Sequence, residues 1–297
     1  MRFALRLFVL LTMAGAAFGQ QRPLITELPE PVEEGKVRLE AGVDFLQNQT
    51  FPLSGLRGDL TRIGVIGARF GLGSRIEFQI HGTARNFLNI NRRGSGPFAA
   101  ILDAAGNSTS ATGDFLFATK IRLREESGSW PAFSFRIGAE LPNQSNESGL
   151  GIDTTRTFGS VLVGKHLGKT HVFSSLGVAI IDNPTQLASQ SDKLVYGVAF
   201  LHPLGSRFRL LGEVHGAHGN PHPGAEDTAV VRLGTQVRAA GFIWDIAGMA
   251  GLQKVDPDSG VIFGVSRDFQ IFPAPGRAQR GAFRYDPVLF PAARRTQ

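Results

Sequence analysis

Hydrophobic and charged side chains alternate along residues 114–141. In the first part, apolar residues occupy odd-numbered positions and basic residues occupy even-numbered ones. The apolar residues are Phe115, Phe117, Ile121 and Leu123, and the basic ones are Lys120, Arg122 and Arg124. After a short connection that contains Gly128, the alternation resumes over residues 132–141. Successive side chains of a strand point to opposite faces, so the pattern predicts an antiparallel hairpin with one apolar and one charged face. A soluble sheet would show the same alternation, so the hairpin alone does not identify its surroundings.

The same pattern recurs along the chain and predicts twelve strands. They cover residues 37–47, 60–70, 74–86, 114–124, 132–141, 155–166, 170–182, 193–202, 207–217, 228–238, 241–252 and 260–269. Their length of about ten residues is near the upper end for globular strands and matches a tilted membrane-spanning strand.

Short and long connections between these strands alternate strictly. The short ones are residues 71–73, 125–131, 167–169, 203–206 and 239–240, and the long ones are residues 48–59, 87–113, 142–154, 183–192, 218–227 and 253–259. Outer-membrane barrels have short periplasmic turns and longer extracellular loops. An even number of strands also puts both termini of the barrel chain on the periplasmic side. The sequence therefore predicts an all-β protein, an antiparallel transmembrane β-barrel of about twelve strands over residues 37–269.

The charged parity is expected to face the lumen, because an Arg or Lys facing lipid near the bilayer midplane costs about 2–4 kcal/mol. The predicted lumen-lining or constriction residues are Glu77, Asp114, Lys120, Arg122, Arg136, Glu140, Arg209, Glu213, Arg232 and Asp245. The residues predicted to face lipid include Phe115, Phe133, Val161, Val178, Tyr196, Leu210, Trp244 and Phe263. Charges of both signs in a confined lumen indicate a paired network. Such pairs either limit the size and polarity of solutes or simply stabilise a small barrel.

The two ends of the 297-residue chain differ from its middle. Residues 1–19 have a basic start, a short apolar core and small residues at the end, which predicts a cleaved secretory signal peptide rather than a membrane anchor. Residues 20–36 are rich in Pro and Glu and predict an extended periplasmic leader. Residues 270–297 form a basic, Pro-containing tail that is disordered, binds a periplasmic partner or folds into the barrel. The last predicted strand ends on Phe269, an aromatic residue of the kind that barrel-assembly machinery recognises.

Composition narrows the function classes. The absence of cysteine excludes a disulfide framework and thiolate metal sites. The formal net charge of +6 includes Arg2 and Arg6 of the signal peptide, and the modest remainder argues against nucleic-acid binding. We therefore expect outer-membrane lipid, barrel-assembly machinery and small-molecule solutes as partners, in a Gram-negative outer membrane.

Several short motifs are shared with a known family. Residues 24–29 read LITELP, residues 138–142 read GAELP, residues 165–168 read KHLG and residues 256–261 read DPDSGV. With Gly113-Asp114-Phe115 and Gly212-Glu213, they make the chain resemble the family named for the MetA pathway of phenol degradation, outer-membrane transporters often encoded with aromatic-degradation genes. The resemblance implies passage of small molecules, hydrophobic or aromatic ones among them. The basic tail and residues 87–113 depart from the compact family pattern.

Other motifs predict ordinary loops. Residues 164–170 look like a phosphate-binding loop but have one residue too few between the glycines, so a tight turn is expected. His215, His218 and His222 are close enough in sequence to suggest a metal site, but loop histidines are the simpler interpretation. Residues 256–260 lack the downstream Glu of a calcium loop.

The sequence predicts an outer-membrane channel or transporter-like barrel for passive uptake of small molecules, with no catalytic, cofactor or metal site. Two rival classes stay open. One is a non-conducting structural or surface-interaction barrel. The other is an outer-membrane lipid-modifying enzyme, for which His171 and Ser174 are poorly arranged because they fall on opposite faces of one predicted strand.

Overall fold

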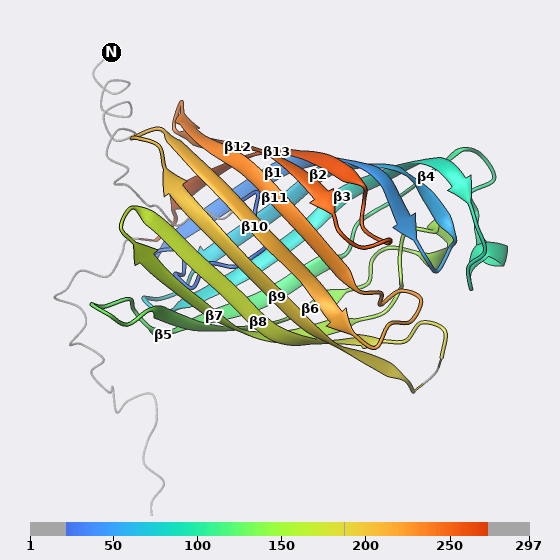
Figure 1. The fold of residues 1–297 in the computed structure, drawn as a ribbon, viewed down its shortest axis with the longest axis horizontal. Coiled ribbons are helices and arrows are strands. Elements are labelled where there is room, and N and C mark those ends of the chain that lie inside the picture. The colour runs from blue at the N-terminus through green and yellow to red at the C-terminus, as the bar shows by residue number, and fades with distance from the viewer. Residues whose placement is uncertain (1–21, 187, 273–297) are drawn as a thin grey trace, which may run out of the picture.

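The computed structural model describes residues 22–186 and 188–272, and this part of the chain is a closed antiparallel β-barrel (Figure 1). Twelve strands form the wall: β1 (Lys36–Phe51), β2 (Leu56–Gly71), β3 (Ile76–Arg93), β5 (Phe115–Arg124), β6 (Ala132–Leu141), β7 (Arg156–Leu167), β8 (Thr170–Asp182), β9 (Gln190–Pro203), β10 (Phe208–Gly219), β11 (Thr228–Ala239), β12 (Phe242–Gly251) and β13 (Ser259–Gln270). Pairing of β1 with β13 closes the barrel. The predicted strand number and antiparallel order are confirmed.

Three strands, β1, β2 and β3, continue well beyond their predicted ends. β1 and β2 stay paired as far as Phe51 and Leu56, and β3 runs on to Arg93, where a short strand, β4 (Ser108–Ala111), pairs with it. A single 3₁₀ turn, η1 (Ala99–Ile101), lies between them, and a second, η2 (Asn146–Ser148), follows β6. Parts of the predicted loops 48–59 and 87–113 are therefore strand. The alternation of apolar and polar side chains did not predict these parts as strand. Backbone pairing continues past the membrane, where outward side chains no longer need to be apolar.

The two ends of the barrel differ in the way that the connections predict. In Figure 1 the short turns gather at the end where the chain enters, and the long connections with β4 lie at the opposite end. Short turns mark the periplasmic end of an outer-membrane barrel. Within the described residues, no helix is long and apolar enough to cross a membrane.

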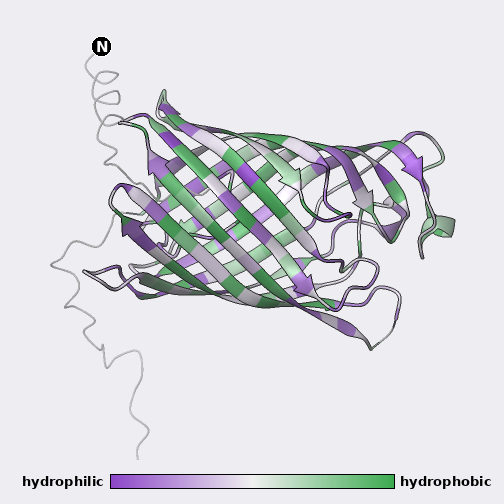
Figure 2. Ribbon diagram, in the orientation of Figure 1, coloured by the Kyte–Doolittle hydropathy of each residue, from purple (hydrophilic) through white to green (hydrophobic). Residues whose placement is uncertain are grey.

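The outer face of the wall is apolar. Figure 2 shows the alternation as bands of hydrophobic and polar residues along each strand. Of the residues predicted to face lipid, Val161, Val178, Trp244 and Phe263 are exposed on the barrel, while Phe115, Phe133, Tyr196 and Leu210 are half-buried against their neighbours. A β-bulge at Gly64, which has φ +65°, shifts the alternation by one residue within β2.

Residues 22–35, here called the lumen segment, lie inside the barrel. Leu24 and Leu28 are buried with Phe173, Leu201 and Leu211, which belong to β8, β9 and β10. The prediction of an extended periplasmic leader over residues 20–36 is therefore wrong for residues 22–35, which lie inside the barrel. The predicted signal peptide, and the tail from residue 273 onward, lie outside the described residues.

At the extracellular end, apolar side chains of the wall hold the loops. Leu56, Leu60 and Leu88 pack with Leu150, from the connection that follows β6. Leu102, from the connection between β3 and β4, is partly buried against the same cluster. The loops are thus packed against the barrel mouth by burial of apolar surface.

Candidate functional site

Glu27 of the lumen segment is held by three cations of the wall. Its carboxylate oxygens lie 3.0 Å from Nη1 of Arg69, 3.4 Å from Nζ of Lys120 and 3.7 Å from Nη2 of Arg136. Lys120 also lies 3.1 Å from Oε1 of Glu77. All but Arg136 are nearly inaccessible to solvent. The cluster therefore depends on mutual pairing, because an isolated buried charge is strongly unfavourable.

The backbone of the lumen segment is bound mainly by side chains; at its end, Gly35 also donates its N–H to the carbonyl of Gly71 in β2. Pro23, Pro29 and Pro31 remove three N–H donors and prevent a regular ladder, so the remaining polar groups need other partners. Lys120 donates to the carbonyls of Leu28 (3.0 Å) and Glu30 (3.2 Å). These contacts fix the middle of the segment to β5.

Both ends of the lumen segment are anchored in the same way. Near its start, the carboxylate of Glu213 accepts the N–H groups of Ile25 and Thr26 at 2.9 and 2.8 Å. Near its end, Glu77 accepts the N–H of Val32 at 2.5 Å. Carboxylates that accept backbone N–H groups make strong, charge-assisted hydrogen bonds. The segment is thus docked along the lumen.

Six of the ten predicted lumen residues hold this segment. They are Glu77, Lys120, Arg136, Glu213, Arg232 and Asp245. Arg232 donates to the carbonyl of Pro23 at 2.9 Å, and Asp245 lies 3.3 Å from Nε of Arg22. The sequence identified their inward direction but not the segment that they bind.

The other four predicted residues lie elsewhere. Glu140 pairs with Arg156 in the lumen. Asp114 accepts the N–H groups of Asn143 and Gln144 and so holds the connection after β6. Arg122 lies at the periplasmic turn, where it donates to the carbonyl of Ser74 and pairs with Glu125. Asp114 also lines a cavity of the lumen, whereas Arg122 lines none of the lumen cavities described below. A constriction role for either residue stays a prediction.

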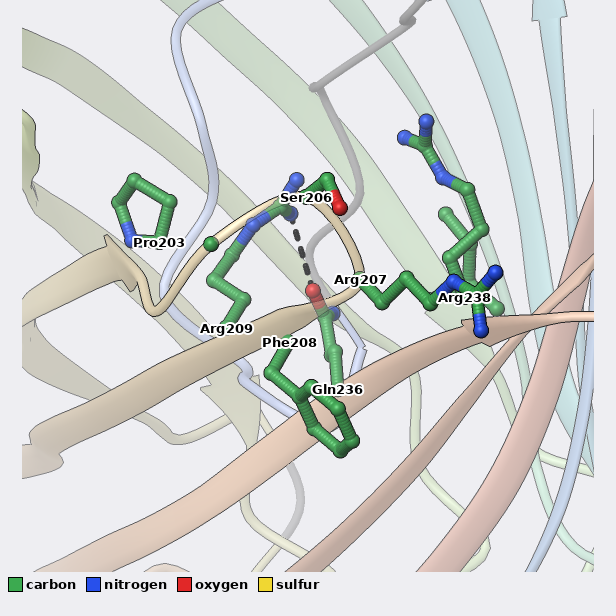
Figure 3. Close-up of a pocket in the computed structure, with 9 residues that line it drawn as sticks. Pro203, Ser206, Arg207, Phe208, Arg209, Gln236 and Arg238 are labelled. Atoms are coloured by element: carbon green, nitrogen blue, oxygen red, sulfur yellow. Dashed lines mark hydrogen bonds between the residues drawn. The ribbon is translucent and has the colours of Figure 1, made fainter.

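Arg209, the last of the four, lies at the periplasmic rim. It donates from Nη1 to Oε1 of Gln236 at 2.9 Å, and Figure 3 shows this contact beside Arg207 and Arg238. Gln236 in turn donates to the carbonyl of Arg22. Arg209 therefore supports the start of the lumen segment indirectly.

A chamber remains between the lumen segment and the extracellular loops. It consists of three neighbouring cavities of about 440, 320 and 260 Å³. Arg156 lines all three, and Arg62 lines the first and third. The side chains of Ile25 and Glu27 form part of its floor.

The sequence pattern did not lead us to predict several residues that line the lumen. They are Glu27, Arg38, Glu40, Asp44, Arg62, Arg69 and Arg156. Arg38, Glu40 and Asp44 share one parity of the first predicted strand, so the same alternation contained the signal for them. Glu27 carried no such signal because it precedes every strand.

The remaining motifs are ordinary structure. The glycine-rich residues 164–170 span the end of β7, a turn at Gly168 with φ +62°, and the start of β8, so the predicted tight turn is confirmed. His218 pairs with Asp227 at 2.6 Å, while His215 lies 3.8 Å from Glu213 in the lumen. No group of three or more potential ligands positioned to hold a metal occurs within residues 22–186 and 188–272.

Acidic pH is expected to release the lumen segment only well below pH 4.5. Burial alone would raise the pKa of Glu27, but Arg69, Arg136 and Lys120 outweigh it and hold the pKa well below the ordinary 4.5. A carboxylate whose pKa is lowered in the docked state stabilises docking at pH values above its ordinary pKa. This stabilisation is lost as the pH falls through the lowered pKa. Burial raises the pKa of Glu30, so its protonation on the way from pH 7 to 5 favours docking. Conductance measured from pH 7 to 5 should therefore stay level or fall; a rise in that range would contradict the expectation.

The likeness to known proteins lies in the fold. No family model matches the chain, and no curated protein matches it in sequence. The COG4313 outer membrane channel from Pseudomonas putida F1 shares 15% identity over 81% of this chain and 97% of its own, with a TM-score of 0.56. The translocator domain of the autotransporter NalP from Neisseria meningitidis shares 13% identity over 78% of this chain and 88% of its own, with a TM-score of 0.46. The NanC porin shares 8% identity over 77% of this chain and 97% of its own, with a TM-score of 0.47. The chain thus has the fold of a bacterial outer-membrane β-barrel, and its membership of the family that its motifs resemble stays a prediction.

Proposed function

We propose that this barrel is an outer-membrane channel for passive passage of small molecules, narrowed at its periplasmic end by its own lumen segment. The observation that carries the proposal is the chamber. Side chains can fill the interior of a barrel of about eight strands, and a barrel with more strands has room for a cavity. Here cavities of about 440, 320 and 260 Å³ adjoin one another above the lumen segment.

Passage would require the lumen segment to move. Up to Gly35, which bonds through its backbone to Gly71 of β2, the described segment joins the wall through side chains and through no continuous ladder. That part of the segment can therefore leave without breaking the barrel. Passive channels also need binding that is weak enough for solutes to leave. Hydrophobic and aromatic molecules, which the sequence motifs suggest, suit the apolar part of the chamber, where Leu116, Phe158 and Val195 lie.

A non-conducting structural barrel is the second candidate. The buried network of Glu27, Arg69 and Lys120 favours it, because a firmly docked segment closes the lumen. We propose no catalytic role: His171 is buried on the inner face of β8, and Ser174 lies on the outer parity of the same strand.

Conductance across planar bilayers distinguishes these candidates. A folded barrel, identified by faster gel migration before boiling than after it, is expected to give small, uniform current steps in KCl. The steps should be small because the lumen segment fills the inner part of the barrel. Background current from the folded wild type and also from a variant with a loosened lumen segment would contradict the channel and favour the structural barrel.

A further inference from the structure

Two arginines divide the chamber. Arg62 of β2 and Arg156 of β7 line both the outer cavity of about 260 Å³ and the central cavity of about 440 Å³. They lie on strands separated by three others in the wall, β3, β5 and β6. A solute that moves from the extracellular cavity to the central one therefore passes beside both side chains.

Both arginines are paired, yet both remain accessible from the lumen. Arg62 lies 3.9 Å from Oδ2 of Asp44, and Arg156 pairs with Glu140. The arginine side chains are 40% and 42% exposed, whereas those of Asp44 and Glu140 are 11% and 26% exposed. The guanidinium groups thus reach further into the passage than the carboxylates that neutralise them.

The cations of the lumen segment cluster are different. Arg69 and Lys120 are only 6% and 2% exposed, and their charges are used in binding Glu27 and Glu77. Arg69 borders the central cavity with little exposed surface, and Lys120 lines none of the three cavities. Arg136 and Arg232 also line the central cavity, but their side chains are only 14% and 11% exposed. Accessible positive charge in the chamber therefore belongs mainly to Arg62 and Arg156.

Part of the wall beside Arg156 is apolar. Inward side chains of β5, β7, β8 and β9 line the cavity of about 320 Å³: Leu116, Phe158, Leu162, Ile181 and Val195. A guanidinium beside such a surface can bind a carboxylate while the apolar body of the same molecule is buried. Neither a small cation nor a strongly hydrated anion would gain both contributions.

We propose that Arg62 and Arg156 form the specificity filter of the lumen, and that the preferred solute is a small organic carboxylate with an apolar body. The inference rests on the proposed channel function and adds a substrate class to it. Arg is suited to this role because its planar guanidinium keeps its charge and can hold a carboxylate through two hydrogen bonds.

Benzoate and benzylammonium, which share a ring and differ in charge, test the filter. Reversal potentials in gradients of potassium benzoate and of benzylammonium chloride give the permeability of each ion. We expect wild type to prefer benzoate. The double variant Arg62→Gln/Arg156→Gln should lower the benzoate-to-benzylammonium ratio by about tenfold, which corresponds to about 1.4 kcal/mol.

Arg57 provides a matched control. It is 35% exposed and pairs with Asp258 at 2.8 Å, but it lines none of the three cavities. Arg57→Gln should leave the ratio unchanged within about twofold. Arg62→Lys/Arg156→Lys keeps the positive charges but loses the two-point contact with a carboxylate, so its ratio should fall between those of wild type and the double Gln variant. Gel mobility before and after boiling confirms that each variant folds.

The outcomes separate this inference from the channel itself. Wild type that conducts without preferring benzoate, or a folded double Gln variant with an unchanged ratio, would overturn the filter and leave the channel standing. Background current from every folded variant would overturn the proposed function and the filter together.

Discussion

Replacing Glu27 with glutamine is expected to raise the conductance of the barrel by about tenfold or more, because it releases the lumen segment. Glu27 pairs with Arg69, Lys120 and Arg136. Arg69 also pairs with Glu40 and Glu77, so the three formal positive charges of the cluster are balanced by three carboxylates only when Glu27 is ionised. Removing one partner of a buried ion pair costs about 3–5 kcal/mol. Glutamine has nearly the same shape as glutamate, so the substitution removes charge and little packing.

Glu33→Gln is the matched control. Glu33 belongs to the same segment and pairs with Lys36 at 2.7 Å, but its side chain is 61% exposed, and exposed pairs of this kind are worth about 0–1 kcal/mol. Its conductance should equal that of wild type. If Glu27→Gln folds as a barrel and conducts no more than Glu33→Gln, then the Glu27 cluster does not control passage.

The wall of the barrel could be predicted because each strand carries its own evidence. Lys120 and Arg136 lie at inward positions of strands whose other face is apolar, and lipid tolerates only one assignment of those faces. The connections then fixed which end is periplasmic. Both arguments use residues close together in the sequence.

The position of the lumen segment could not be predicted in this way. Its Pro- and Glu-rich composition is typical of a disordered leader. What orders it is contact with residues far along the chain: Glu27 with Lys120, and the N–H of Ile25 with Glu213, 188 residues away. Only the closed barrel brings those partners together.

Arg62 was missed for a local reason. Strict alternation along β2 would place Arg62 and Arg69 on opposite faces, since their numbers differ in parity. The bulge at Gly64 shifts the alternation between them, and both side chains point inward. Gly tolerates the positive φ of +65° found there, and a glycine within a strand is the sequence signal for such a bulge.

A disulfide between the lumen segment and the wall should close the channel reversibly. A Cβ atom at Gly197 of β9 would lie 2.4 Å from Oγ1 and 3.1 Å from Cγ2 of Thr26, so the Cβ atoms of two cysteines would fall close to the separation of about 3.5–4.5 Å that a disulfide needs. The Thr26 hydroxyl has no hydrogen-bond partner among the described residues, so its loss should cost little. Since the chain contains no cysteine, Thr26→Cys/Gly197→Cys should form this bond and no other within one molecule.

Current through the oxidised double variant is expected to fall to background, and a reducing agent should restore it in the same bilayer. The reduced protein is the better control, because a side chain at Gly197 opposite an intact Thr26 would collide with it and disturb docking by itself. The bond holds the lumen segment at Thr26, which Glu213 binds and which lies two residues before the Leu28 carbonyl that Lys120 binds, so the bond should keep this part of the segment in the lumen while it is intact. If the oxidised barrel conducts as well as the reduced one, solutes pass the docked segment, and movement of that segment is not the step that opens the lumen.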